Sequence, residues 1–492
     1  MIASSEWLER HATPVALLLF VINLALVLPM IAAQSIWFDE AVTMSNAQQP
    51  FDVARYMVAD ATPPLYPLLV HLWMRLFGVT IESARALSVL ASAASVVLVF
   101  QLGRRFLEPR AGLFAALLLI CSRFQIFFAH EARPYAVVVL LCVASFYVLL
   151  ALCEAVTWRR VLLLGVLDAA LLYTHYVAVF ALLAQGLVAL TLVRRSPRTF
   201  FAVAASQAIA ALLVLPLALY VATLWPLPMA GWLAEPTWRS LPIELAKLVG
   251  TDLLLALEAV LILGGLLWIS RRHAAADTRA DADADAARFD PAKARVLALW
   301  AFAPLLTAFA VSFVVPIFLG RYLLYVAPGL FLLVGYVAAR LPVAPTTRAL
   351  LVLGVCALSL GNALRDPIVR PAWRDAAARV RDDVRDGALA VVVPAHQLLP
   401  FAYHFAPQHF GIPAQLPALL AGEGVLGASR LTDVQNFATG ERDVVVLFPD
   451  GTAGADGLGA SLANAGYTQV SRQELPHLVL LRFNRGGSPA SR

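Results

Sequence analysis

Two adjacent carboxylates, Asp39 and Glu40, follow the first long apolar stretch of the sequence, in the motif Trp37-Phe38-Asp39-Glu40. Carboxylates at the edge of a hydrocarbon layer are costly unless they face a polar cavity, a metal ion or a substrate. A carboxylate in such a cavity can deprotonate an acceptor hydroxyl and act as a general base. The alternative is that both side chains only solvate the end of a helix.

Three more polar constellations occur where long apolar runs meet. Glu131 and Arg133 stand before Pro134-Tyr135, and the pairs His175-Tyr176 and Arg321-Tyr322 each place one polar group beside a tyrosine. Arginine is the side chain best shaped to bind phosphate. Together these groups suit a substrate that carries both phosphate and hydroxyl groups. Taken singly, Glu131 and Arg133 could form a structural ion pair, and the others could anchor helices at the membrane interface.

Long apolar runs separate these constellations. Of the 492 residues 61% are hydrophobic and 14% are charged, against about 25% charged in an average soluble domain. The runs have the length that a helix needs to cross a hydrocarbon layer of about 30 Å. Eleven crossings are predicted, at 14–36, 84–103, 111–128, 134–153, 161–174, 177–193, 199–225, 253–270, 296–315, 317–339 and 348–363.

The distribution of Lys and Arg predicts the orientation of these crossings. Basic clusters such as Arg104/Arg105 and Arg194/Arg195 fall on one side of the membrane if the N-terminus is cytoplasmic, as the positive-inside bias requires. The formal charge of +5 is therefore attributed to membrane orientation rather than to nucleic-acid binding. The polar constellations and the C-terminus then lie on the outer face of a bacterial cytoplasmic membrane.

The chain divides into a transmembrane part, 1–363, and an outer α/β domain, 364–492. The transmembrane part includes a first outer loop at 37–83 and a low-complexity Ala/Asp loop at 271–295, interpreted as a cytoplasmic linker. The first outer loop contains Tyr66 and His71, and its stretch 65–77 is aromatic-rich, as expected of a helix that lies in the interface. In the outer domain, helices are predicted at 371–385 and 457–465 and strands at 388–393, 443–448 and 477–483.

At these residues the sequence resembles the GT-C glycosyltransferases of the dolichyl-phosphate-mannose–protein mannosyltransferase and lipid A aminoarabinose transferase kind. The resemblance covers roughly residues 15–385. Its carriers are Trp37-Phe38-Asp39-Glu40, Thr62-Pro63-Pro64-Leu65-Tyr66, His71-Leu72-Trp73, Glu131-Ala132-Arg133-Pro134-Tyr135, Thr174-His175-Tyr176 and Arg321-Tyr322-Leu323-Leu324. The fold that it implies is an all-α membrane fold with a small C-terminal α/β domain.

The resemblance implies transfer of a hexose or pentose from a polyprenyl-phosphate donor to a lipid, glycan or protein acceptor, usually with inversion. By this match Asp39 is the base, Glu40 supports it or helps to bind a divalent metal ion, and Glu131 is a second catalytic carboxylate. The same match makes Arg321 the contact of the donor phosphate. The other substrate-binding candidates are Arg133, Tyr135, His175, Tyr176, Tyr322, Tyr66 and His71.

The sequence departs from the family pattern in two places. Thr62 stands where many relatives have a histidine before two prolines, and the first outer loop has no Asp-x-Asp motif, so dependence on a metal does not follow. Two other classes of function stay open. A transporter or flippase of a lipid-linked or anionic solute would also need helix-borne arginines and carboxylates. A structural partner could recruit other envelope proteins through its C-terminal domain.

Overall fold

The computed structural model describes residues 4–52, 62–194, 196–223, 233–276, 289–438 and 443–485. The chain forms two compact units. The first, which we call the helical unit, consists of residues 1–29, 56–66 and 85–367. The second, which we call the sheet unit, consists of residues 30–55, 67–84 and 368–492. About half of the predicted Ala/Asp linker of 271–295, at 277–288, lies outside the described residues.

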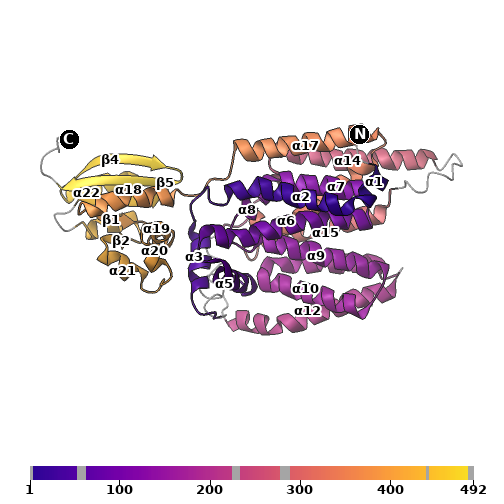
Figure 1. Ribbon diagram of the computed structural model, residues 1–492, viewed down its shortest axis with the longest axis horizontal. Helices are drawn as coiled ribbons and strands as arrows, with labels where there is room; N and C mark the ends of the chain where they lie inside the picture. Colours follow the sequence, from indigo (N-terminus) through magenta and orange to yellow (C-terminus); the bar gives the residue numbers. More distant parts are fainter. Residues whose placement is uncertain are drawn as a thin grey trace. The chain divides into compact units, whose positions relative to one another are not determined.

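The helical unit is a bundle of helices, most of them long and apolar (Figure 1). They are α1 (Ser5–Arg10), α2 (Ala12–Val27), α6 (Ile81–Phe106), α7 (Pro109–Cys121), α8 (Arg123–Ala129), α9 (Tyr135–Glu154), α10 (Trp158–Thr174), α11 (Val179–Leu192), α12 (Pro197–Thr223), α13 (Ser240–Val249), α14 (Asp252–Ala276), α15 (Pro291–Val311), α16 (Ala327–Arg340) and α17 (Pro345–Arg365). Short 3₁₀ helices η1 (Leu28–Met30), η2 (Tyr176–Ala178) and η5 (Gly320–Val326) extend α2, α11 and α16.

Eight helices in the described part of the chain are long and apolar enough to cross a membrane. They coincide with eight of the eleven predicted crossings. A ninth prediction, at 111–128, corresponds to α7 and α8, which meet at Ser122 with a bend of 66°. The remaining two correspond to α10 and to η2 with α11, each 17 residues long, or about 26 Å at 1.5 Å per residue. That length is the lower limit for a crossing, so the count of eleven stays a prediction.

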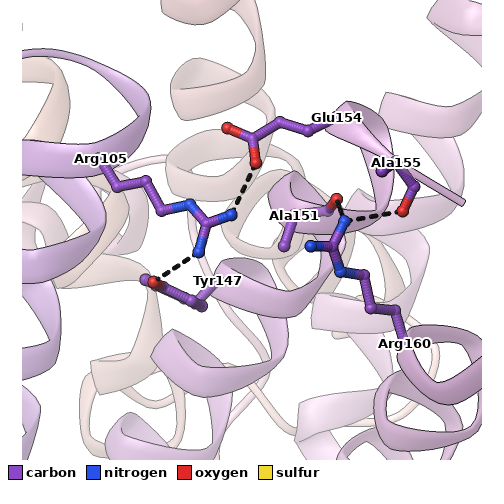
Figure 2. A network of polar contacts seen from close by, with 6 residues as sticks. All are labelled: Arg105, Tyr147, Ala151, Glu154, Ala155 and Arg160. Carbon is purple, nitrogen blue, oxygen red and sulfur yellow. Dashed lines mark hydrogen bonds and ion pairs between the residues drawn. The ribbon is translucent and has the colours of Figure 1, made fainter. Parts of the chain in front are cut away.

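Figure 2 shows polar contacts where α9 ends and α10 begins, next to the end of α6. Arg105 donates a hydrogen bond to the Tyr147 hydroxyl at 3.1 Å and pairs with Glu154 at 2.8 Å. Arg160 donates to the carbonyls of Ala151 and Ala155 at 2.6 and 2.8 Å. Carbonyls in the last turn of a helix lack partners within the helix, so Arg160 caps α9. The predicted cytoplasmic clusters thus also hold helix ends together.

The sheet unit contains helices and a five-stranded sheet. Its helices are α3 (Phe38–Gln48), α5 (Leu65–Phe77), α18 (Trp373–Arg385), α19 (Leu398–Phe405), α20 (Pro407–Phe410), α21 (Leu416–Gly422) and α22 (Ala455–Asn464), with 3₁₀ helices η6 (Ala395–Gln397) and η7 (Leu431–Asn436). Its strands are β1 (Leu389–Val392), β2 (Val425–Gly427), β3 (Val444–Pro449), β4 (Tyr467–Leu475) and β5 (Leu478–Arg485), in the order β2-β1-β3-β5-β4.

Strand alternation gives this sheet two apolar faces. Strand β1 pairs in parallel with β2 and β3, while β5 is antiparallel to β3 and β4. Successive side chains point to opposite faces, so Ala390 and Val392 pack with α18 and α19 while Val391 packs with η7 and α22. The predicted α/β class is confirmed. All five predicted elements are present, whereas β2, β4 and α19–α21 were not predicted.

Candidate functional site

One end of the helical unit gathers four of the predicted substrate-binding residues. Helix α9 begins at Tyr135, α10 ends next to His175, and η5 carries Arg321 and Tyr322. These residues line a narrow pocket together with Val138, Leu324 and Tyr325. Helices that run alternately up and down bring the start of one beside the end of the previous one. Three connections that are far apart in the sequence therefore meet in one place.

Aromatic rings form the wall of this pocket. The ring centroids of His175 and Tyr322 lie 4.9 Å apart, and that of Tyr135 lies 6.1 Å from His175 and 6.5 Å from Tyr322. The guanidinium carbon of Arg321 lies 5.7 Å from the centre of the Tyr322 ring. Such a cation–π contact holds the guanidinium against an aromatic face.

Two arginines and one carboxylate carry charge in and around the pocket. Arg133, Arg321 and Glu131 all lie within electrostatic range of the Tyr135 hydroxyl. Both arginines also act on the ring of His175. Glu131 is fully buried and Arg133 is 6% exposed. Because charge interactions strengthen where water is excluded, two arginines against one carboxylate favour an anionic group at this place.

Residues that were not predicted hold Arg321 in place. The N–H of Gly320 donates to Glu244 Oε2 at 2.8 Å, and the same carboxylate pairs with Lys247 at 2.6 Å. A β-carbon at position 320 would overlap the Glu244 carboxylate, so a larger residue there would displace that carboxylate. The signal in the sequence was weak, because a carboxylate three residues before a lysine is an ordinary helix pair.

Two buried aromatic residues support the other end of η5. Trp300 donates a hydrogen bond to the Tyr325 carbonyl at 3.1 Å, and the Tyr325 hydroxyl donates to the Val177 carbonyl at 2.9 Å. The Trp300 ring stacks on Phe146 with centroids 4.0 Å apart. These contacts tie α9, η2, α15 and η5 together behind the pocket.

Tyr66 and Tyr176 occupy different positions relative to this pocket. The Tyr66 hydroxyl lies 3.2 Å from Ser88 Oγ, and Ser88 lies 3.5 Å from the Arg133 carbonyl, so Tyr66 supports the backbone of Arg133. Tyr176 precedes α11 and lies in electrostatic range of Tyr220, at the end of α12. Tyr176 is not among the residues that line the pocket.

The predicted carboxylates Asp39 and Glu40 belong to the sheet unit. They lie in the first turn of α3, where carboxylates interact favourably with the helix dipole. Asp39 is partly exposed, and its carbonyl accepts a hydrogen bond from the Thr43 hydroxyl at 3.0 Å. Glu40 is completely buried and pairs with Arg370 at 3.7 Å. The two neighbours therefore have different environments.

His71 also contacts α3. Its Nδ1 lies 2.7 Å from the Ala47 carbonyl, and its ring lies 5.9 Å from that of Phe51. A histidine nitrogen that bonds to a backbone carbonyl carries the proton, so His71 fixes α5 against the end of α3. This contact describes a structural role, and the predicted role in substrate binding stays a prediction.

The residues do not fit the metal site considered for Asp39 and Glu40. Over the described ranges, no three His, Cys, Asp or Glu side chains lie close enough together to hold a metal ion. The Glu40 carboxylate already has a cationic partner in Arg370, which is 3% exposed in its side chain. A metal ion would add a second positive charge beside that guanidinium. We therefore derive no catalytic step through a metal.

Comparisons with known proteins identify the architecture. Residues 61–220 match the family model described as dolichyl-phosphate-mannose-protein mannosyltransferase. The crystal structure of ArnT from Cupriavidus metallidurans in the apo state is similar, with a TM-score of 0.59 and 15% identity over 96% of this chain and 98% of that one. Its complex with undecaprenyl phosphate gives a TM-score of 0.53, also at 15% identity, over 98% of both chains. The chain has the GT-C fold.

A third structure agrees with this assignment. The oligosaccharyltransferase of Archaeoglobus fulgidus in the apo form has a TM-score of 0.52 and 12% identity over 90% of this chain and 70% of that one. No curated protein sequence matches the chain. The predicted resemblance to GT-C glycosyltransferases is confirmed in the fold, and the chain is a multi-pass membrane protein.

The family match covers part of the site in this GT-C chain. Residues 61–220 include seven of the eleven predicted site residues, namely Tyr66, His71, Glu131, Arg133, Tyr135, His175 and Tyr176. Asp39, Glu40, Arg321 and Tyr322 lie outside the matched range. The assignment of Asp39 and Arg321 therefore depends on the motifs around them and on the contacts described above.

Proposed function

We propose that this GT-C protein transfers a sugar from a polyprenyl-phosphate-linked donor to an acceptor hydroxyl on the outer face of a bacterial cytoplasmic membrane. The observation that carries the proposal is the pocket of Tyr135, His175, Arg321 and Tyr322, with Arg133 within electrostatic range. A phosphate bound there is neutralised by two guanidinium groups. The polyprenyl chain of the same molecule can stay in the bilayer beside the apolar helices.

The reaction is a displacement at the anomeric carbon of the sugar. Asp39 accepts the proton of the acceptor hydroxyl, and the hydroxyl oxygen forms the new glycosidic bond. The bond between the anomeric carbon and the phosphate oxygen breaks, and polyprenyl phosphate leaves with the electron pair. Arg133 and Arg321 stabilise the additional negative charge on the leaving phosphate. A single displacement of this kind inverts the anomeric configuration.

Two lines of support come from the similar proteins. The matched family is described by its use of dolichyl-phosphate-mannose, which is a polyprenyl-phosphate sugar, and by its protein acceptors. The similar ArnT structure holds undecaprenyl phosphate. We extend the donor class from these proteins to the present chain. The acceptor of this chain belongs to the same broad set of lipid, glycan and protein hydroxyls.

A transfer assay with purified protein in lipid nanodiscs tests the proposal. Undecaprenyl-phosphate-linked hexoses and pentoses are offered with cell-envelope extract as the source of acceptors, and release of undecaprenyl phosphate is measured. We expect release that depends on both donor and acceptor. Movement of the donor across a vesicle membrane without cleavage would instead identify a flippase, and the absence of both activities would favour a structural partner.

Substitution of Asp39 tests the catalytic step. Asp39→Asn keeps the shape of the side chain and removes the base, so transfer should slow by at least about a hundred-fold while binding of undecaprenyl phosphate is unchanged. Asp52→Asn, an exposed carboxylate of the same segment, is the matched control and should transfer normally. Full activity in EDTA is expected of a base mechanism without a metal. If Asp39→Asn retained full activity, Glu131 would become the candidate base.

A further inference from the structure

Residues far apart in the sequence meet at the Glu40–Arg370 ion pair. Glu40 belongs to the first turn of α3, and Arg370 lies just before α18. Their charged groups approach to 3.7 Å, and both side chains are almost completely buried, with exposed fractions of 0% and 3%. A buried charge is tolerated when it is paired, and removing one partner leaves the other uncompensated. The ion pair therefore helps to fix the position of both side chains.

Further hydrogen bonds join the segment before α3 to the same stretch of chain. The N–H of Arg370 donates to Gln34 Oε1 at 2.8 Å, and Gln34 Nε2 donates to the Ile368 carbonyl at 3.0 Å. The N–H of Arg374 donates to Ser35 Oγ at 3.0 Å. The side-chain amide of Gln34 thus both accepts from and donates to the backbone of residues 368–370. These bonds fix the position of the segment that leads into α3.

The other end of α3 is attached to α20 of the same unit. Ser45 donates a hydrogen bond to the Phe410 carbonyl at 2.8 Å, and Gln49 donates to the Gly411 carbonyl. Near the start of the helix, the Phe38 ring lies 4.8 Å from that of His396. Contacts at both ends leave α3 little freedom to rotate about its axis.

We infer that Arg370 is a positioning residue for Asp39 and that the C-terminal segment serves as the platform on which α3 presents this carboxylate. Neighbouring residues on a helix point about 100° apart. With Glu40 held inward by Arg370, Asp39 is directed to a different side, where it stays partly exposed. The inference rests on the proposed function insofar as Asp39 is the base, and it gives the C-terminal domain a role in catalysis.

The role of Arg370 in holding α3 can be tested without measuring activity. In Arg370→Gln, amide hydrogen exchange of residues 38–48, measured by mass spectrometry on the full chain, should become faster, while exchange of α9 and α11 stays unchanged. Arg374→Gln is the matched control, since its side chain donates to the Ala32 carbonyl at the surface and its backbone bond to Ser35 is retained. Unchanged exchange of α3 in Arg370→Gln would overturn the inference.

Kinetics test the consequence for Asp39. A shift of about 1 Å in a catalytic group can cost on the order of a hundred-fold in rate. We expect kcat to fall about ten- to a hundred-fold in Arg370→Gln with unchanged affinity for undecaprenyl phosphate, and to recover largely in Arg370→Lys, which keeps the charge. A normal kcat in Arg370→Gln, with Asp39→Asn inactive, would refute a positioning role. Full activity of Asp39→Asn would refute the assignment of Asp39 as the base. The hydrogen-exchange experiment would then still test whether Arg370 holds α3 in place.

The double variant Glu40→Gln/Arg370→Gln provides a control for folding. It removes both charges together and should be more stable than either single variant, because no uncompensated charge is left buried. If the three variants were equally stable, the two charges would not be coupled and the inference would fail.

Discussion

Gln185 of α11 donates a hydrogen bond to Asp168 of α10 at 2.9 Å, and both side chains are fully buried in the helical unit. Ser145 of α9 donates to the same carboxylate oxygen at 2.5 Å and accepts from Gln185 at 2.7 Å. Three consecutive long helices are thus joined by one polar cluster. Because hydrocarbon offers no replacement partner, such clusters hold membrane helices together.

Removing the carboxylate should weaken the bundle. Asp168→Ala removes the acceptor of the Ser145 hydroxyl and of one Gln185 hydrogen bond, and we expect the free energy of unfolding to fall by about 1–3 kcal/mol. Asp168→Asn keeps one acceptor oxygen and should lose less. Unfolding by SDS titration from mild detergent measures both. Ser270→Ala, which removes an exposed hydroxyl bonded within its own helix, is the control. Equal stability of Asp168→Ala and wild type would contradict the role of the cluster.

Arg321, which lines the pocket, and Arg133, which lies near it, should determine affinity for the phosphate of the donor. Loss of one charge-assisted hydrogen bond to a buried anion costs about 1.5–3 kcal/mol, or roughly ten- to a hundred-fold in Kd. Arg133→Ala and Arg321→Ala should each weaken binding of undecaprenyl phosphate by this factor, measured by native mass spectrometry. Arg123→Ala, whose guanidinium pairs with Asp366 at 2.8 Å, should bind normally. Near-native binding in both pocket variants would exclude them from the site.

The predicted orientation places the connections with basic clusters in the cytoplasm. It places the connections with the polar constellations, and the C-terminal domain, on the outer side of the membrane. Reporter fusions after Arg195 or Arg272 should report the cytoplasm, and fusions after Pro50 or beyond Arg385 should report the outer side. A cytoplasmic signal from the C-terminal fusion would contradict the predicted orientation. The Asp39 segment would then face the cytoplasm instead of the outer side, where the proposed reaction takes place.

The sheet unit should lose stability in mild acid through His396. Partial burial beside Phe38 lowers the pKa of this histidine below its ordinary value of 6.5. The folded state therefore binds fewer protons than the unfolded state, and stability falls as the pH drops from about 6.5 towards the lowered pKa. In His396→Asn the pH dependence that this histidine contributes is absent. The difference in free energy of unfolding between wild type and variant should therefore be smaller at pH 5.5 than at pH 7.5. A gap that stays constant would show that His396 does not titrate in this range.

The long apolar helices, three of the five strands of the C-terminal region and the resemblance to the GT-C family were predicted from the sequence. Local patterns carry this information, because the length of an apolar run is fixed by the thickness of the bilayer and the alternation of a strand by its pleat. Tyr135, His175, Arg321 and Tyr322 were also predicted to lie together, in a larger group that included Arg133 and the carboxylates. Its members lie at helix ends, and the alternation of crossings assigns those ends to one side.

The partner of each buried charge was decided by the tertiary structure. Glu40 stands beside Asp39 in the sequence and was predicted to share its function, yet its carboxylate meets Arg370, more than three hundred residues away. Glu244 likewise meets Gly320, and no feature of either segment indicates that contact. The local sequence around a charged residue does not specify its partner. The packing of all the helices and strands decides which opposite charge is buried next to it.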